Sequence, residues 1–210
     1  MKLSDILLKY KIHKLSKITS KEFFKQIKDH NGKTKKLFEI IIKIANYSNK
    51  NDKLILVNAG YAMDLALGFI SRNHGDLDLI GLEKDLNFFR KYFSKMSFEL
   101  GCADGHDTNY SFTFQKDKLS GDVDSIKIVN EEVSDIEKEG EKRWAWPIKT
   151  SELIWSRKIN DMVIYFVSPT LVYDFKKRVE KRGHLREKER HDFKILEKHF
   201  PYLKNYSIYE

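Results

Sequence analysis

Disulfides, flexible linkers and membrane-spanning segments are missing from this chain of 210 residues. The single cysteine, Cys102, excludes a disulfide within the chain. Only 3 prolines occur, and no Ser/Gly-rich linker, internal repeat or low-complexity segment is visible. No apolar run approaches the roughly 20 residues of a membrane helix, and residues 1–17 are too evenly charged for a signal peptide. These absences predict a cytoplasmic protein without a membrane partner.

Hydrophobic residues make up 41% of the chain and aromatic residues 13%, which is enough for a substantial core. The length suits one domain with a smaller helical appendage, or two small domains. The 39 Lys and Arg residues exceed the 31 Asp and Glu residues by 8, which favours polyanionic ligands such as nucleotides, RNA or DNA, or acidic partners. A lysine-rich solvated surface would give the same excess, so charge alone is weak evidence for nucleic acid.

The most informative stretch lies between residues 53 and 81. The apolar run 54–57 predicts a buried strand, and Gly60 then permits a turn that a residue with a Cβ atom would resist. Residues 61–67 have the pattern of a short helix that Gly68 would end. Residues 76–80 alternate polar and apolar side chains, which predicts a second strand.

The second strand carries two acidic side chains on one face. Asp76 and Asp78 are two positions apart, so they leave the strand in the same direction and repel each other. A divalent cation between them would remove the repulsion, and paired carboxylates are common Mg²⁺ ligands. Arg72 lies just upstream, where it could reach a phosphate. The alternative is an edge strand with a solvated acidic face.

The whole stretch resembles a motif of the small antibiotic nucleotidyltransferases. These are the lincosamide and aminoglycoside adenylyltransferases of the DNA polymerase beta-like superfamily, with the pattern G-G-x-A-x-D-x-x-x-G-x-x-x-R-x-H-x-D-x-D. The matching positions here are Ala59, Gly60, Ala62, Asp64, Gly68, Arg72, His74, Asp76 and Asp78. Ala59 replaces the first glycine, and Tyr61 stands where a tryptophan is usual. The resemblance implies an α/β (α+β) fold: a mixed β-sheet core with flanking helices and a C-terminal helical region.

A hairpin predicted from strands at 110–114 and 122–129 supplies a third acidic position. The superfamily carries a third carboxylate on a strand beside the D-x-D strand, and the resemblance assigns it to Asp124. Asp122 is the alternative because it shares the face of Asp124 but lies nearer the turn. Either residue could instead be a solvated strand position.

The C-terminal part resembles the same enzymes. Ser168 and Pro169 are a typical helix start, with Ser168 as N-cap, and residues 186–196 resemble R-x-K-D-x-x-D with Glu189 in place of the first Asp. In the related abortive-infection toxins a lysine near the nucleotide stands at the position of Lys176.

Further C-terminal residues are weaker candidates. Lys177 follows Lys176 in the same basic run. Arg186 and Asp192 either contact the ligand or pair with each other across a helical hairpin.

The resemblance implies transfer of an NMP from an NTP to an acceptor hydroxyl, with release of pyrophosphate. Asp76 and Asp78 would hold two Mg²⁺ ions, or Mn²⁺, and Asp124 would bind one of them or act as general base. The phosphates would contact the residues Gly60, Arg72 and Lys176.

Two further motif residues would support the site. Asp64 would act as a helix cap or orient other ligands, and His74 would be a structural hydrogen-bonding residue rather than a base.

The acceptor stays open between a small antibiotic-like molecule and a macromolecule, RNA or protein, as for a toxin. A catalytically silent nucleotide-binding or partner-binding module is the alternative to an enzyme.

The predicted division is 1–50 as N-terminal helices, 51–167 as the nucleotidyltransferase core and 168–210 as the C-terminal helical region. The N-terminal helices, expected over 2–16, 20–30 and 34–47, could bind a protein partner.

Overall fold

The computed structural model describes residues 2–10, 12–26, 32–102, 110–129, 132–135, 145–181, 183 and 186–206, and the side chains among these except those at 129–151. The strands are β1 His13–Ile18, β2 Ile55–Val57, β3 Leu77–Leu82, β4 Glu99–Gly101, β5 Ser111–Lys116, β6 Leu119–Val129, β7 Glu132–Asp135, β8 Ala145–Lys149, β9 Ile154–Ile159 and β10 Met162–Val167. The α-helices are α1 Leu3–Lys9, α2 Ser20–Phe23, α3 Lys33–Lys50, α4 Ala59–Leu67, α5 Leu86–Lys95, α6 Thr150–Leu153, α7 Pro169–Lys181 and α8 Glu187–His199, and the 3₁₀ turns are η1 Glu83–Asp85 and η3 Pro201–Asn205.

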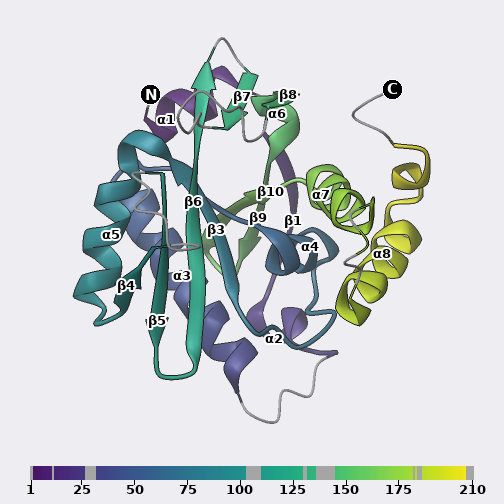
Figure 1. Cartoon of the computed structure of the whole chain (residues 1–210), viewed down its shortest axis with the longest axis horizontal. Coiled ribbons are helices and arrows are strands. Elements are labelled where there is room, and N and C mark those ends of the chain that lie inside the picture. Colours follow the sequence, from purple (N-terminus) through teal and green to yellow (C-terminus); the bar gives the residue numbers. More distant parts are fainter. Residues whose placement is uncertain are drawn as a thin grey trace.

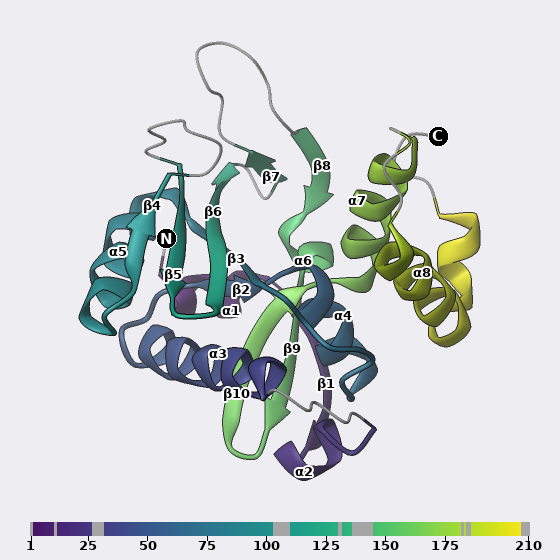
Figure 2. The same cartoon turned by 60° about the horizontal axis from the view of Figure 1, so that its bottom comes forward.

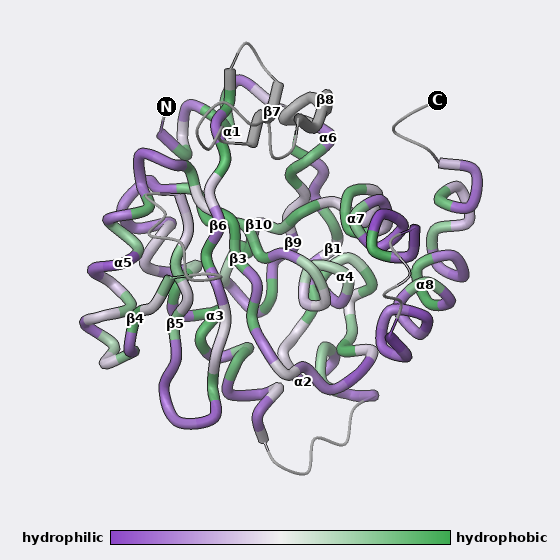
Figure 3. Tube along the Cα trace, in the orientation of Figure 1, coloured by the Kyte–Doolittle hydropathy of each residue, from purple (hydrophilic) through white to green (hydrophobic). Residues whose placement is uncertain are grey.

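The described strands form one mixed sheet in the order β1-β9-β10-β2-β3-β6-β5-β4, and β7 and β8 extend it from β6 (Figure 1). β3 lies at its centre, antiparallel to β2 and parallel to β6. Hydrophobic residues are frequent on the inner strands β3 and β10, while hydrophilic residues are frequent on α5 and α8 (Figure 3). The predicted mixed α/β fold is therefore confirmed.

Helices α3 and α5 cover one face of the sheet. The α3 residues Leu37, Ile41 and Ile44 are fully buried, as expected for the apolar stripe of an amphipathic helix. Phe89 of α5 lies 3.4 Å from where a Cβ atom on Gly81 would stand, so α5 covers the face of β3 to which position 81 belongs. Because side chains alternate along a strand, Asp78 belongs to the opposite face.

Helices α7 and α8 pack against each other and against α4, and they form a separate helical layer beside the sheet (Figure 2). This layer lies at the side of the molecule where β3 begins. The polar end of β3 therefore lies close to the C-terminal helices, which the sequence places about one hundred residues away.

Several predicted elements are present with small shifts in their bounds. The helices predicted at 34–47 and 61–67 and the strands predicted at 54–57, 76–80, 110–114 and 122–129 correspond to α3, α4, β2, β3, β5 and β6. Gly68 ends α4 with a φ of 87°, the left-handed conformation expected of a glycine after a helix.

The prediction at the N-terminus is wrong in part. The helix expected over 2–16 ends at Lys9, and His13–Ile18 instead pairs in parallel with β9. Leu15 fitted a helical spacing, but the edge of β9 offers this segment backbone hydrogen bonds along a parallel ladder. Thr19, not Ser20, caps α2: its side chain accepts from the Glu22 amide, and the Glu22 carboxylate accepts from the Thr19 amide at 2.6 Å.

Strand β1 joins the same sheet as the predicted core, and the division at residues 51 and 168 stays a prediction. The helix predicted over 20–30 ends at Phe23, and residues 27–30 lie outside the described part. Across the described residues, no helix is both long and apolar enough to cross a bilayer.

Candidate active site

The acidic residues of the motif meet on neighbouring parallel strands. Asp76 immediately precedes β3 and Asp78 is its second residue. On β6, Asp122 lies in register with Asp78, and Asp124 lies in register with Ile80. Directly paired residues of a parallel ladder share a face of the sheet, so all four carboxylates are on the side away from α5. The alternation predicted from sequence thus places these acidic residues together.

Asp124 is electrostatically close to Asp78. Burial, followed by the charges of Asp76 and Asp124, raises the pKa of Asp78 to about 6, while Lys188 and Lys176 act in the opposite direction. Asp122 is paired in register with Asp78 on the neighbouring strand. Both acidic residues of β6 therefore stay candidates for the third carboxylate.

The segment before β3 is held by a buried carboxylate. Asp64 of α4 is fully buried and accepts hydrogen bonds from the Ser71 amide at 3.0 Å and the Ser71 hydroxyl at 2.6 Å. It also lies 2.5 Å from Nε2 of His74. These contacts turn Asp64 away from the other carboxylates and give it an orienting position.

His74 is enclosed on all sides by hydrogen bonds and aromatic contact. The Arg72 guanidinium lies 3.3 Å from its Nδ1, and because arginine can only donate, Nδ1 is the acceptor and Nε2 carries the proton. The His74 amide donates to the Thr34 hydroxyl at 2.9 Å, and the Tyr61 ring packs against the imidazole with centroids 4.0 Å apart. These contacts leave His74 no free nitrogen for a base role.

Gly60 is required for close packing, and the turn predicted there is wrong by one residue. Gly60 lies inside the first turn of α4, and the left-handed residue is Ala59, with a φ of 49°. A Cβ atom on Gly60 would stand 2.7 Å from the His74 ring and 2.9 Å from the Arg72 guanidinium. Only glycine lets these two side chains lie across the start of α4.

Arg72 and Lys176 converge on one buried carboxylate. Asp192 of α8 accepts two hydrogen bonds from Arg72, at 2.8 and 3.1 Å, and one from Lys176 at 2.6 Å. Burial alone would raise the pKa of Asp192, but the hydrogen bonds from Arg72 and the charge of Lys176 hold it below its ordinary value. The structure therefore brings both predicted phosphate ligands beside the carboxylates, each of them bound to Asp192.

The alternative pairing of Arg186 with Asp192 is wrong. Arg186 instead donates to Glu189, one turn into α8, with Nε 2.9 Å from the carboxylate. Asp76 is among the charges that raise the pKa of Arg186, after the hydrogen bond that Arg186 donates to Glu189. Arg186 thus lies on the acidic side of the site without contacting the Arg72–Asp192 pair.

Sequence reasoning missed Lys188 as a site residue. It lies in the second position of α8 and is one of the two lysines whose charge lowers the pKa of Asp78. Its place in the R-x-K-D-like segment was the available signal. Lys177 does not reach Asp78: its ammonium pairs with Glu180 at 3.1 Å and lies over the rings of Tyr173 and Phe193.

The carboxylates fit a metal that is shared with a substrate. No group of three His, Cys, Asp or Glu side chains in the described residues forms a ready-made metal site. Mg²⁺ in nucleotide-handling sites is usually held by one or two carboxylates and completed by phosphates and water. Burial, followed by the charges of Asp76 and Asp124, raises the pKa of Asp78, and a bound cation would offset both effects.

Comparison with known proteins agrees with this geometry. A family model described as aminoglycoside-2''-adenylyltransferase matches residues 40–196. No protein of curated function matches the chain in sequence.

Solved structures give the same result for the fold. A lincosamide antibiotic adenylyltransferase, LnuA with bound lincomycin, is 14% identical with a TM-score of 0.60, covering 78% of this chain and 95% of its own. ANT(2'')-Ia in complex with adenylyl-2''-tobramycin is 14% identical with a TM-score of 0.58, and the match covers 82% of this chain and 94% of ANT(2'')-Ia. A nucleotidyltransferase-like protein from Paracoccidioides brasiliensis is 15% identical with a TM-score of 0.51, covering 78% and 75%. The predicted relationship to the polymerase beta-like nucleotidyltransferases is confirmed.

Proposed function

We propose that this chain, which belongs to the aminoglycoside-2''-adenylyltransferase family, transfers an NMP group from an NTP to a hydroxyl of a small molecule. The acceptor oxygen forms a bond to the α-phosphorus, the bond to the pyrophosphate oxygen breaks, and the acceptor loses a proton. ATP is the donor that the family description favours. The observation that supports the proposal most strongly is the crowding of Asp76 and Asp124 around Asp78, with Lys176 and Lys188 close by.

Asp76 and Asp78 would hold Mg²⁺, which when bound neutralises the triphosphate and favours in-line transfer. Asp124, exposed on β6 and electrostatically close to Asp78, would either complete this cation site or accept the proton of the acceptor hydroxyl.

The basic residues would bind the donor. Lys188 lies at the start of α8 with a partly exposed side chain, so it can contact a phosphate directly. Lys176 is buried and bound to Asp192, and it would act through its positive charge. Gly60, in the first turn of α4, would contribute by letting the Arg72 guanidinium lie against the start of the helix.

A small-molecule acceptor agrees with the solved structures of similar fold. LnuA is described with lincomycin, and ANT(2'')-Ia with adenylylated tobramycin. Both are small antibiotics that carry hydroxyl groups.

The first test is binding of each NTP with and without Mg²⁺, by thermal shift and calorimetry. We expect Mg²⁺-dependent binding of ATP, with about 2.7 kcal/mol of added stability at 100 times the dissociation constant. Asp76→Asn and Asp78→Asn should abolish the Mg²⁺-dependent part. Asp117→Asn is the matched control, because Asp117 is an exposed carboxylate in the β5–β6 turn whose left-handed φ of 53° suits asparagine.

Transfer itself is tested by pyrophosphate release with tobramycin or lincomycin as acceptor. Binding of no NTP by the folded protein in the presence of Mg²⁺ would contradict the proposal and favour a partner-binding module. Nucleotide binding that is indifferent to both Mg²⁺ and Asp78→Asn would indicate a catalytically silent nucleotide-binding protein.

A further inference from the structure

The first turn of α3 is hydrogen-bonded to the segment that leads into β3. Thr34 is the second residue of α3 and is fully buried. Its Oγ1 accepts a hydrogen bond from the His74 amide at 2.9 Å and donates one to Oδ1 of Asn73 at 3.4 Å. Its carbonyl oxygen accepts a third bond, from the Tyr61 hydroxyl at 2.7 Å. One residue of α3 thus binds both parts of the motif, the helix α4 and the segment before β3.

The anchor at His74 lies two residues before Asp76. Gly75, between them, is exposed, and no atom of the described residues, its two chain neighbours aside, lies within 4 Å of where its Cβ atom would stand. Asp76 is also exposed, whereas Leu77 is buried and paired in register with Gly121 of β6. The position of Asp76 is therefore fixed by the sheet on one side and by the anchor at His74 on the other.

Arg72 depends on the same anchor. Its guanidinium donates to the Asn73 carbonyl at 3.1 Å and lies 3.3 Å from Nδ1 of His74. A shift of residues 73 and 74 would therefore also displace the guanidinium from Asp192, which it binds at 2.8 Å. Because Thr34 binds Asn73 and His74, its hydroxyl supports the whole segment between the predicted phosphate ligand and the first acidic residue of the site.

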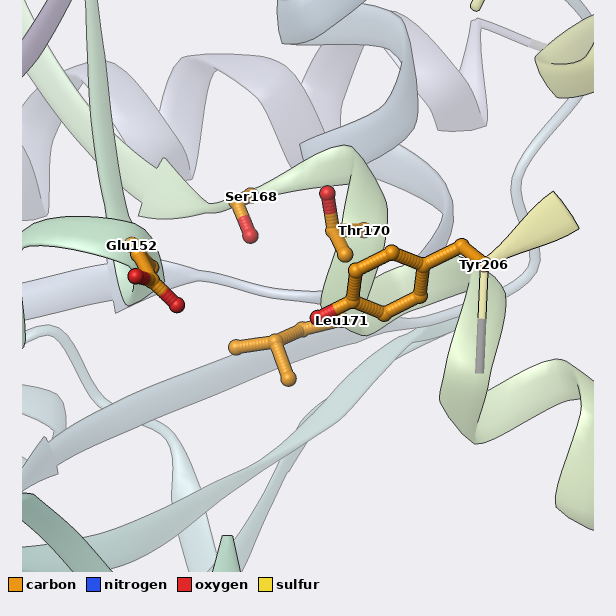
Figure 4. Close-up of a pocket in the computed structure, with 5 residues that line it drawn as sticks. All are labelled: Glu152, Ser168, Thr170, Leu171 and Tyr206. Carbon is orange, nitrogen blue, oxygen red and sulfur yellow. The ribbon is translucent and has the colours of Figure 1, made fainter. Parts of the chain in front are cut away.

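A second buried hydroxyl, that of Ser168, makes no such contact. Ser168 is the N-cap residue of α7, as predicted, and its carbonyl accepts from the Leu171 and Val172 amides at 3.1 Å. Only the side-chain capping bond is not found, and its Oγ has no hydrogen-bond partner among the described residues. Figure 4 shows the pocket of about 170 Å³ beside this hydroxyl and its other lining residues, Glu152, Thr170, Leu171 and Tyr206. Ser168 is thus a buried hydroxyl with which Thr34 can be compared.

We propose that Thr34 is a positioning residue of the candidate site. Its hydroxyl holds Arg72 and Asp76 where the carboxylates of β3 can share one cation, and it thereby sets the affinity of the chain for ATP with Mg²⁺. The inference rests on the proposed function, and it concerns a residue that precedes the part matched by the family model, residues 40–196. The hydroxyl both accepts and donates, which serine can also do and valine cannot.

The test measures Mg²⁺-dependent ATP binding by calorimetry in three variants of the full chain. We expect Thr34→Val to weaken binding about tenfold, the effect of one lost hydrogen bond. Thr34→Ser keeps the hydroxyl and should bind within about twofold of the unaltered chain. Tyr61→Phe keeps the ring beside His74 and removes only the bond to the Thr34 carbonyl, so it should weaken binding about threefold.

A second measurement needs no nucleotide. Hydrogen exchange of the His74 amide, followed by NMR in metal-free buffer, reports the bond to Thr34 directly. We expect this amide to exchange about tenfold faster in Thr34→Val than in Thr34→Ser, because valine offers no acceptor.

Two control variants remove a buried hydroxyl elsewhere. Ser48 lies about 21 Å further along α3, and its hydroxyl donates to the Lys53 carbonyl. Ser48→Ala should lower the free energy of unfolding and leave the affinity for ATP with Mg²⁺ unchanged. Ser168→Ala removes a hydroxyl without a described partner and should leave the affinity unchanged as well.

Binding of ATP with Mg²⁺ by Thr34→Val as tight as by the unaltered chain would overturn the inference, since the bond would then serve the fold alone. Equal weakening by Thr34→Val and Ser48→Ala would also overturn it, because a general loss of stability would explain both. Should Thr34→Val fail to fold, unchanged binding by Tyr61→Phe would have the same force. In each of these cases ATP binding by the unaltered chain leaves the proposed function intact. An unaltered chain that binds no NTP would overturn the proposed function and this inference with it.

Discussion

At the scale of single residues, two neighbours at the start of α4 are subject to different constraints, one from side-chain packing and one from backbone conformation. Gly60 is a glycine because the His74 ring and the Arg72 guanidinium occupy the space of a Cβ atom. Ala59 adopts the left-handed backbone conformation with a φ of 49°, which glycine adopts without steric cost. The family motif has glycine at both positions. This chain keeps Gly60, where packing requires a glycine, and has Ala59 at the position where the backbone conformation favours one.

Ala59→Gly should therefore raise the free energy of unfolding. Left-handed backbone costs alanine roughly 1–2 kcal/mol, and the greater freedom of glycine in the unfolded chain offsets part of that. We expect a net gain of about 0.5–1 kcal/mol in urea denaturation. Ala62→Gly is the control: Ala62 is buried inside α4, and the same change there should cost about 1 kcal/mol. Equal losses for both variants would contradict the assigned strain.

Asp78 should make the stability of the chain depend on pH. Its pKa in the folded chain is about 6, above the unfolded value, so the folded state favours the protonated form. The contribution of Asp78 to the free energy of unfolding is fully present below about pH 4 and is lost as the pH rises through about 6. Asp78→Asn should therefore be more stable than the unaltered chain at pH 8 by on the order of 2 kcal/mol, and no more stable at pH 4.

Urea denaturation between pH 4 and pH 8 in metal-free buffer measures this difference. Asp117→Asn, in the exposed β5–β6 turn, should give a curve parallel to that of the unaltered chain. A constant difference between Asp78→Asn and the unaltered chain across the range would contradict the raised pKa.

At the scale of elements, two side chains fix the C-terminal end of α4. Its own Asp64 binds Ser71 in the segment that follows the helix, and Arg157 of β9 caps the last turn. The buried Arg157 guanidinium donates to the carbonyls of Leu65 at 2.6 Å and Ala66 at 3.1 Å. These carbonyls belong to the last turn of α4, where intrahelical donors run out.

Arg157→Met should destabilise the chain because it leaves the α4 carbonyls buried without donors. We expect a loss of roughly 2–4 kcal/mol in chemical denaturation. Lys158→Met changes the exposed neighbour on the same strand and should cost less than about 0.5 kcal/mol. Similar losses of stability for the two variants would contradict the role of the hydrogen bonds from Arg157 to the last carbonyls of α4, and would indicate a general effect of replacing a charged residue on β9.

At the scale of the whole molecule, Asp192 joins the motif segment to the C-terminal helices. It is fully buried and binds Arg72, which precedes β3, and Lys176, which lies on α7. A carboxylate in this position fixes both cations beside the acidic end of β3. The candidate site thus combines parts of the chain 120 residues apart.

Asp192→Asn should leave the buried Lys176 and the partly buried Arg72 without their counter-charge. Breaking a buried ion pair from one side typically costs about 3–5 kcal/mol, and we expect a loss of that order. Mg²⁺-dependent ATP binding should weaken together with stability, since Arg72 and Lys176 would no longer be held. Glu187→Gln, an exposed carboxylate near the start of α8, is the control for calorimetry and denaturation. Unchanged stability for Asp192→Asn would contradict the coupling.

The local sequence predicted the elements whose hydrophobic pattern agrees with their packing. The strand–helix–strand unit around α4 and the β5–β6 hairpin follow directly from alternation and from helical spacing. Strand β1 was missed because its edge pairing with β9 depends on residues 140 positions away, and a spacing pattern cannot report such a contact. Lys188 was missed for the same reason, since its closeness to Asp78 arises only when α8 packs beside β3.

The sequence by itself determined the fold class and the pair of aspartates that defines the candidate site, because strand geometry places residues two apart on one face. Only the tertiary structure decided that Asp124 acts on Asp78, which partner Arg186 and Asp192 each take, and why Gly60 is a glycine. Those outcomes depend on distances between segments far apart in the chain, and the sequence specifies such distances only through the complete packing of the molecule.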